Sequence, residues 1–216
     1  MTPALRPPLA RIVGAADLDE LRRAVRALDR LGADDLAALA ALVSTWRDDQ
    51  AIANLLMYPK LLPPELRAAA LLRALDGTAP YLTLAAVVGL EALDGGRFTD
   101  DERVVLRERL LALVSGVEPL LAVRAAAALA GYLDGGELAR VVPLLAHRDP
   151  RVAHNLIVAL AEHVDIAALD AAIAREVSFT PDLAAVLRAR LRPTPPDTPV
   201  LPYLPSLRAC SAPAPG

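Results

Sequence analysis

The side chains best suited to metal binding or acid–base chemistry in this chain are its three histidines, His147, His154 and His163. They are separated by seven and nine positions, whereas two metal ligands on one helix usually lie three or four positions apart. His147 and His154 flank a turn that contains Asp149, so a metal held across a helical hairpin is one alternative. The spacing favours histidines on a surface or in a groove, and we expect no metal ligands and no cofactor.

Other patterns that would indicate catalysis are absent from the sequence. The chain has neither a glycine-rich phosphate loop nor a Gly-x-Ser-x-Gly nucleophile elbow. Its single cysteine, Cys210, has no histidine near it in the sequence, which argues against a catalytic thiol. Adjacent aspartates such as Asp100-Asp101 precede predicted helices, where carboxylates complement the helix dipole. We therefore expect no catalytic residues, and an enzyme or ligand carrier that uses a groove is the alternative.

A further group of polar and aromatic residues interrupts otherwise apolar helices. Tyr, Trp and Arg are the residue types that most often dominate binding at protein interfaces. The candidate partner-binding residues are Trp46, Asn54, Tyr58, Arg124, Tyr132, His154, Asn155, Glu162 and His163. If successive helices lie side by side, these residues form a ridge on one concave face. Ordinary solvent exposure of each helix is the alternative interpretation.

The composition indicates which elements position these residues. Hydrophobic residues make up 55% of the chain and aromatic residues only 3%, so Leu, Ala and Val must form the core. Ala and Leu are strong helix formers, which favours an all-α fold. The net charge of -3 argues against a nucleic-acid partner. No stretch reaches the roughly 18 apolar residues that a membrane span needs.

Capping motifs predict where several helices begin. Asp17 with Glu20, and Thr99 with Glu102, have the spacing of a capping box. Asp149 and Thr180 each precede a proline, which is favoured at the first position of a helix. The lone cysteine and the absence of a signal-peptide pattern at residues 1–8 lead us to expect a cytoplasmic protein.

An internal repeat indicates how the helices are arranged. Residues 81–96 align with residues 121–136 at an offset of 40, and the latter align with residues 152–164 at an offset of 31. A weaker copy begins near Ala51. Each of the three stronger copies follows a predicted amphipathic helix, at 65–75, 100–115 and 137–147. Helical hairpins of this kind bury their apolar faces only by stacking on their neighbours.

One stretch has the order of an apolar helix, an Asp-containing turn and a second helix with small residues. It consists of residues 138–145, then Asp149-Pro150-Arg151-Val152, then Leu160. This order resembles a HEAT-like repeat of the short bacterial, PBS-lyase type, and the resemblance covers residues 50–165 best. It implies a right-handed α-solenoid whose concave face binds a protein or peptide. HEAT-repeat enzymes that hold iron carry repeated His-Glu pairs, which this chain lacks. An ordinary bundle of the same helices is the alternative architecture.

We expect an N-terminal arm at 1–15, the solenoid at 16–192 and a tail at 193–216 that contains eight prolines. Such a tail favours extended polyproline structure. It also carries five apolar side chains that a solvated linker would not need: Val200, Leu201, Tyr203, Leu204 and Leu207. These residues could dock on the chain's own solenoid, giving autoinhibition, or on a second copy, giving self-association. Binding to a partner is the third alternative. The alternative is a disordered tail.

Overall fold

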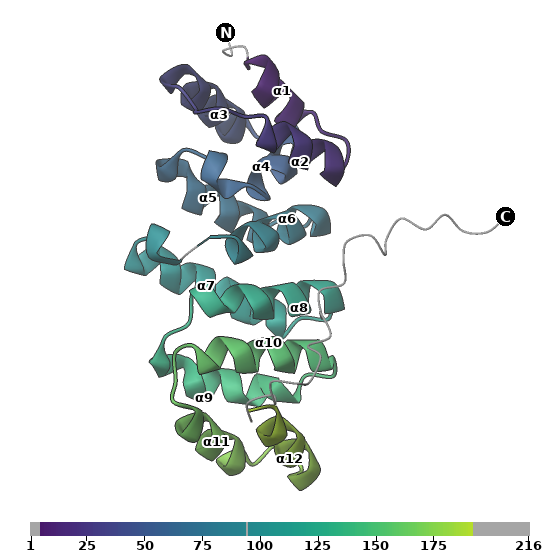
Figure 1. The fold of residues 1–216 in the computed structure, drawn as a ribbon, viewed down its shortest axis with the longest axis vertical. Helices are drawn as coiled ribbons and strands as arrows, with labels where there is room; N and C mark the ends of the chain where they lie inside the picture. Colours follow the sequence, from purple (N-terminus) through teal and green to yellow (C-terminus); the bar gives the residue numbers. More distant parts are fainter. Residues whose placement is uncertain (1–4, 94, 192–216) are drawn as a thin grey trace, which may run out of the picture.

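The computed structural model describes residues 5–93 and 95–191, which form an elongated stack of helices with the first helices at one end and the last at the other (Figure 1). Within these ranges the fold is all-α and contains no strand. The helices form two layers. Layer A contains α1 (Pro7–Val13), α4 (Asp49–Leu56), α6 (Pro80–Glu91), α8 (Pro119–Ala128), α10 (Pro150–Ala161) and α12 (Pro181–Arg190). Layer B contains α3 (Ala33–Thr45), α5 (Pro64–Leu75), α7 (Asp100–Val114), α9 (Leu138–Val141) and α11 (Ile166–Arg175).

Each layer A helix packs against the next one in the chain, and α6, α8, α10 and α12 also contact layer B. The central helices α4, α6, α8 and α10 begin at residues 49, 80, 119 and 150, which are 31, 39 and 31 positions apart. They run parallel, because bonds join their starts, as between Asp49 and Tyr81, and their ends, as between Ala130 and His163. A residue at a given position of one helix therefore lies beside the corresponding turn of its neighbours. The longer step of 39 includes α7, a helix of 15 residues.

The predicted helix starts are confirmed where a local capping motif specifies them. At α7 the Glu102 amide donates to Thr99 Oγ1 at 3.3 Å, and the Thr99 amide donates to Glu102 Oε2 at 2.8 Å. Asp149 caps α10 and Thr180 caps α12 through their side-chain oxygens. These bonds satisfy amides that have no partner inside the helix.

The predicted helix over 137–147 is wrong as a continuous element. The segment is divided into the 3₁₀ turn η4 (Gly135–Glu137), the single α-turn of α9 and the 3₁₀ helix η5 (Val142–Ala146). Pro143 lies within η5, has no amide hydrogen and clashes with the carbonyl four residues earlier in an α-helix. Further 3₁₀ turns are η1 (Pro59–Leu61), η2 (Gly95–Arg97) and η3 (Leu129–Gly131).

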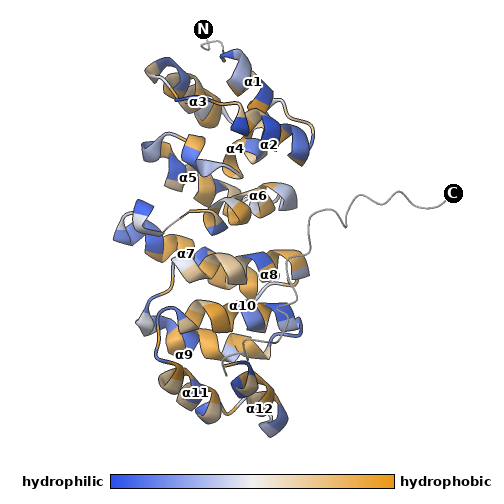
Figure 2. Cartoon of the chain, viewed as in Figure 1, coloured by the Kyte–Doolittle hydropathy of each residue, from blue (hydrophilic) through white to orange (hydrophobic). Residues whose placement is uncertain are grey.

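The predicted N-terminal arm, residues 1–15, includes a packed helix. α1 contacts α4 and α2 (Leu18–Arg26), and its Leu9 and Ile12 side chains are fully buried. Figure 2 shows α2 as mainly hydrophilic and α10, in the stack, as mainly hydrophobic. The packed fold therefore begins before residue 16, and α2 presents charged side chains to solvent.

An ion pair fastens the start of the chain to layer B. Arg6 donates through Nε to Asp35 at 2.6 Å, and the Asp35 carboxylate also accepts from the Gly32 amide at 2.8 Å. Asp35 is buried, whereas Arg6 is half-exposed. The hydrogen bond from Arg6, followed by that from Gly32, lowers the pKa of the Asp35 carboxyl below its ordinary value.

This pair predicts a pH-dependent contribution to stability. Because the pKa of Asp35 is lower in the folded than in the unfolded chain, the pair stabilises fully above about pH 5 and progressively less as the pH falls. The free energy of unfolding of Arg6→Ala should therefore fall below that of the wild type at pH 7, and the difference should shrink towards pH 3. Urea denaturation at a series of pH values measures it. Arg11→Ala, a change at an exposed residue of α1, is the control. A difference that does not vary with pH would contradict the prediction.

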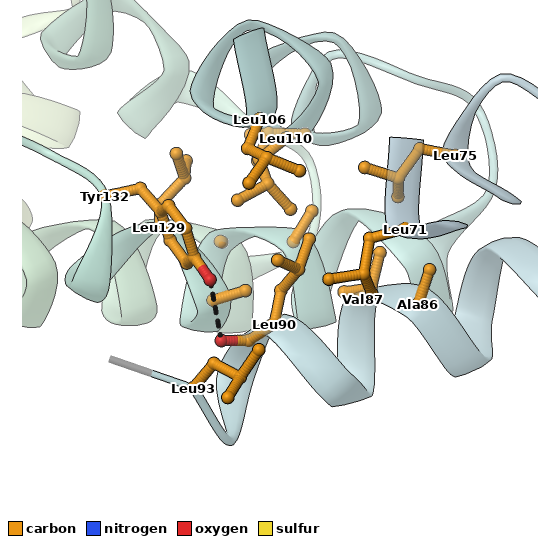
Figure 3. Packing of buried hydrophobic residues seen from close by; sticks show 14 of the residues in the cluster. Leu71, Leu75, Ala86, Val87, Leu90, Leu93, Leu106, Leu110, Leu129 and Tyr132 are labelled. Carbon is orange, nitrogen blue, oxygen red and sulfur yellow. Dashed lines mark hydrogen bonds between the residues drawn. The ribbon is translucent and has the colours of Figure 1, made fainter. Parts of the chain in front are cut away.

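The core is continuous from α1 to α12 and consists mainly of Leu and Ala. Figure 3 shows side chains of α6 and α7 between Leu71 and Leu75 of α5 on one side and Leu129 and Tyr132, which follow α8, on the other. Small residues let the backbones approach closely. A Cβ atom at Gly89 of α6 would lie 2.0 Å from the Leu56 carbonyl oxygen at the end of α4, and one at Gly95 would lie equally close to the Gly131 carbonyl oxygen. Glycine is thus required at both crossings.

Of the helices in residues 5–93 and 95–191, none has the length and apolarity needed to cross a membrane.

Candidate protein-binding surface

Most of the polar residues predicted to bind a partner form bonds between successive layer A helices. Asn54, Arg124 and Asn155 occupy one register position, five residues after the first residue of α4, α8 and α10. Each side chain bonds to the preceding layer A helix or to the segment at its end. The pattern that interrupts the apolar helices therefore has a structural explanation.

Asn54 makes the most extensive of these contacts. Its Nδ2 lies 3.1 Å from the Ile12 carbonyl oxygen, 3.2 Å from that of Val13 and 3.0 Å from that of Ala15. Carbonyl groups at the end of a helix have no partner within it, and the Asn54 amide supplies one. Because Asn54 is buried, it is not part of a binding surface, and its prediction as a binding residue is corrected.

The prediction that Tyr132 binds a partner is also wrong, because its side chain is fully buried. Its hydroxyl donates to the Leu90 carbonyl oxygen at 3.4 Å, at the end of α6 (Figure 3). The ring also packs against Phe98, with ring centroids 6.0 Å apart. Tyr132 therefore fixes the position of η3 against α6 and has no face available to a partner.

Three further predicted residues are accessible but already engaged within the chain. Arg124 forms an ion pair with Glu91 at 3.1 Å. Asn155 Nδ2 donates to the Val123 carbonyl oxygen at 3.0 Å, and His163 Nε2 lies 2.6 Å from the Ala130 carbonyl oxygen. A carbonyl oxygen accepts hydrogen bonds and cannot donate one, so this bond requires the His163 tautomer with a proton on Nε2. The polar groups of these side chains are therefore used in bonds that join neighbouring helices of the stack.

The other predicted residues do not form one ridge. Trp46 ends α3 in layer B with a left-handed backbone, φ 43°, and the Arg73 guanidinium lies 4.3 Å from its ring centroid. Tyr58 follows α4 and packs partly against the core. His154 is exposed on α10, and Glu162 is exposed at its C-cap. Among the nine predicted binding residues, only these last two remain as freely presented polar candidates.

The structure instead presents a row of apolar side chains on the free side of α6 and α8. They occupy the second, fifth and ninth positions of each helix, which lie on one helical face. We define the layer A patch as Tyr81, Leu84, Val88, Leu120, Val123 and Ala127. The Tyr81 side chain is 48% and the Leu120 side chain 49% exposed, and Val158 of α10 extends the row with 46%.

Two ion pairs and the Asp49 carboxylate border this patch. Glu91 and Arg124 neutralise each other, and Arg151 at the start of α10 binds Asp149 at 2.8 Å. The Tyr81 hydroxyl donates to Asp49 at 3.1 Å. Partial desolvation, followed by this bond to Asp49, raises the pKa of Tyr81, so the phenol remains protonated at neutral pH. The patch is therefore apolar and uncharged.

These patch residues cannot be recognised from the sequence alone, because Leu, Val and Tyr at helical spacing normally form a core. An indication was present: α6 and α8 are apolar on nearly all sides, more than contacts with two neighbours and layer B require. Two layer A neighbours and layer B cover three sides of each helix, so the apolar residues on its remaining side are exposed to solvent.

A depression lies in layer B. This open depression of about 290 Å³ between α7 and η5 is lined by Glu108, Leu111, Ala112, Ser115, Arg140 and Leu144. Arg140 contacts Glu108 at 2.6 Å and Glu137 at 3.0 Å. Its charge is therefore already balanced by chain carboxylates, and the depression offers a ligand no unpaired cation.

No group of three or more His, Cys, Asp or Glu side chains in the described part of the chain is placed to hold a metal ion. The predicted tail-docking residues Val200, Leu201, Tyr203, Leu204 and Leu207 lie outside the described residues. Comparisons with protein-family models, with curated proteins and with solved structures found no match to this chain.

Proposed function

We propose that the chain is a short α-solenoid of the HEAT-like kind. Support comes from the parallel layer A helices, from their spacing of 31 or 39 residues and from the side chains that bond each helix to the one before it. In such an array each hairpin contacts mainly its neighbours, and the aligned helices create an extended surface. The layered contacts of α4, α6, α8 and α10 fit this description better than a closed bundle does.

We further propose that the protein is a non-enzymatic scaffold that binds a protein or peptide on the layer A patch and needs no cofactor. One observation carries this proposal: apolar side chains about half exposed to solvent recur in register on adjacent helices. Contiguous exposed apolar area is costly in water and typically marks an interaction site. An uncharged patch fits an apolar peptide segment better than a nucleic acid or an ionic ligand.

Selection of peptides from a random displayed library tests this proposal and requires no identified partner. Selected peptides should bind the double variant Tyr81→Ser/Leu120→Ser at least tenfold more weakly than the wild type, because truncating interface anchors costs more than about 1 kcal/mol each. Titration calorimetry or fluorescence anisotropy measures the Kd.

The matched control is Val104→Ser/Val105→Ser on α7, where the side chains are 45% and 43% exposed on layer B. This variant removes similar exposed apolar area from the other layer, and peptide binding should be retained. Circular dichroism confirms that both variants are folded. Equal affinity of selected peptides for the wild type and the layer A variant would contradict the proposal.

A further inference from the structure

The layer A patch has an apolar, uncharged surface, and one segment of this chain has the same character. Residues 199–207 contain no charged side chain and include the apolar residues Val200, Leu201, Tyr203, Leu204 and Leu207, whereas charged residues make up 23% of the whole chain. Burying such a segment against the patch removes apolar area from water on both surfaces, and neither the segment nor the six patch residues include an Asp, Glu, Lys or Arg.

The end of the described chain lies at the edge of the stack from which this patch is accessible. Arg190, the last residue of α12, donates through Nη1 to the Pro150 carbonyl oxygen at the start of α10, at 3.2 Å. Because α6, α8 and α10 run parallel, their starts share one edge. Leu120 and Tyr81 are the second residues of α8 and α6, so the chain leaves α12 beside the same edge that carries the two most exposed residues of the patch.

The length and composition of the connection fit this path. Eight residues, 192–199, separate the described chain from Val200, and four of them are prolines. An extended polyproline chain covers about 3.1 Å per residue, which gives a reach of about 25 Å. Packed helices are about 8–10 Å apart, so α8 is one helix and α6 two helices beyond α10. The connection reaches α8, and the following apolar residues suffice to cross to α6.

We propose that residues 199–207 dock on the layer A patch of the same molecule and so compete with the partner for it. This proposal rests on the patch being the binding surface of the scaffold. The tail then acts as a built-in competitor, and the apparent affinity for a partner is lowered by the fraction of molecules in which the tail is docked.

The unique cysteine, Cys210, allows a direct test in the full chain, because it lies three residues after Leu207. A nitroxide spin label on Cys210 should broaden the amide NMR signals of Tyr81, Leu120 and Val123 in layer A. The signals of Val104 and Val105 in layer B should be unaffected. The tail variant Tyr203→Ser/Leu204→Ser should abolish the selective broadening. Broadening that is absent, or equal in both layers, overturns the proposal.

Two further measurements separate the alternatives. Isotope-labelled Cys210→Ser chain mixed with unlabelled, spin-labelled chain reports docking between molecules. Layer A broadening in that mixture, with none within a molecule, would show that a second copy is the occupant and would overturn docking within one molecule.

Library-selected peptides should bind the tail variant several-fold more tightly than the wild type. Equal affinity for both chains, with loss of binding only in Tyr81→Ser/Leu120→Ser, would reject the tail proposal and leave the scaffold proposal standing.

Discussion

Gly89→Ala is expected to destabilise the fold by about 3 kcal/mol or more, at the upper end of the cost of overpacking a core. The new Cβ atom would lie 2.0 Å from the Leu56 carbonyl oxygen and 3.3 Å from the Pro59 ring. A carbonyl at the end of α4 cannot rotate away as a flexible side chain would, so α4 and α6 must separate. The separation would loosen contacts along the whole helix pair.

The sign of this effect distinguishes packing from helix propensity. Replacing a glycine inside a helix by alanine ordinarily stabilises a protein by about 0.5–1 kcal/mol. Gly131→Ala is the control, because its nearest contact would be an ordinary 3.5 Å to the Leu93 carbonyl oxygen. Chemical denaturation monitored by circular dichroism gives both free energies of unfolding. A Gly89→Ala variant as stable as the wild type would contradict the close crossing of α4 and α6.

Asn54→Asp should cost about 3–5 kcal/mol at neutral pH, the usual consequence of leaving a buried charge without an opposite charge beside it. Only the Gln50 amide, which donates to Asn54 Oδ1 at 3.1 Å, would still face the carboxylate as a donor. The amide nitrogen that now faces three carbonyl oxygens of the α1 segment would be replaced by a carboxylate oxygen, so donation would become repulsion. The substitution hardly changes the volume of the side chain, so packing contributes little to the loss.

The pH dependence of this variant has a defined sign. Burial next to carbonyl oxygens raises the pKa of the introduced carboxyl above its unfolded value of about 3.9. The variant should therefore recover stability relative to the wild type as the pH falls through that raised pKa, because the protonated carboxyl can donate again. Urea denaturation from pH 7 to 4 measures the recovery. Asn155→Asp, half-buried against one carbonyl, is the control and should lose much less; equal losses would contradict the role assigned to Asn54.

The sequence predicted the features that depend on near neighbours in the chain. Thr99 and Glu102 lie on consecutive turns, so their capping box forms wherever the helix is placed. The all-α class followed similarly from the abundance of Ala and Leu. The expected continuous helix over 137–147 is wrong because Pro143 has no amide hydrogen to donate, so the α-helix ends two residues earlier, at Val141.

The roles of single polar residues could not be predicted because they depend on how neighbouring helices are staggered. Asn54 and His154 both interrupt an apolar helix, yet Asn54 meets the carbonyl groups of α1 and His154 faces solvent. A shift of one residue in register would exchange such environments. The same dependence hid the layer A patch, since only the packing shows that Tyr81 and Leu120 are left uncovered.

The side-chain bonds that join one helix to another across layer A have a consequence for synthesis on the ribosome. They connect residues at most 42 positions apart, as between Asn54 and Ile12 or between Tyr132 and Leu90. Each helix can therefore complete its bonds to the preceding helix soon after it leaves the exit tunnel, without waiting for distant sequence. A growing chain would acquire its structure one hairpin at a time, and a pause in translation would leave a shorter but already ordered stack.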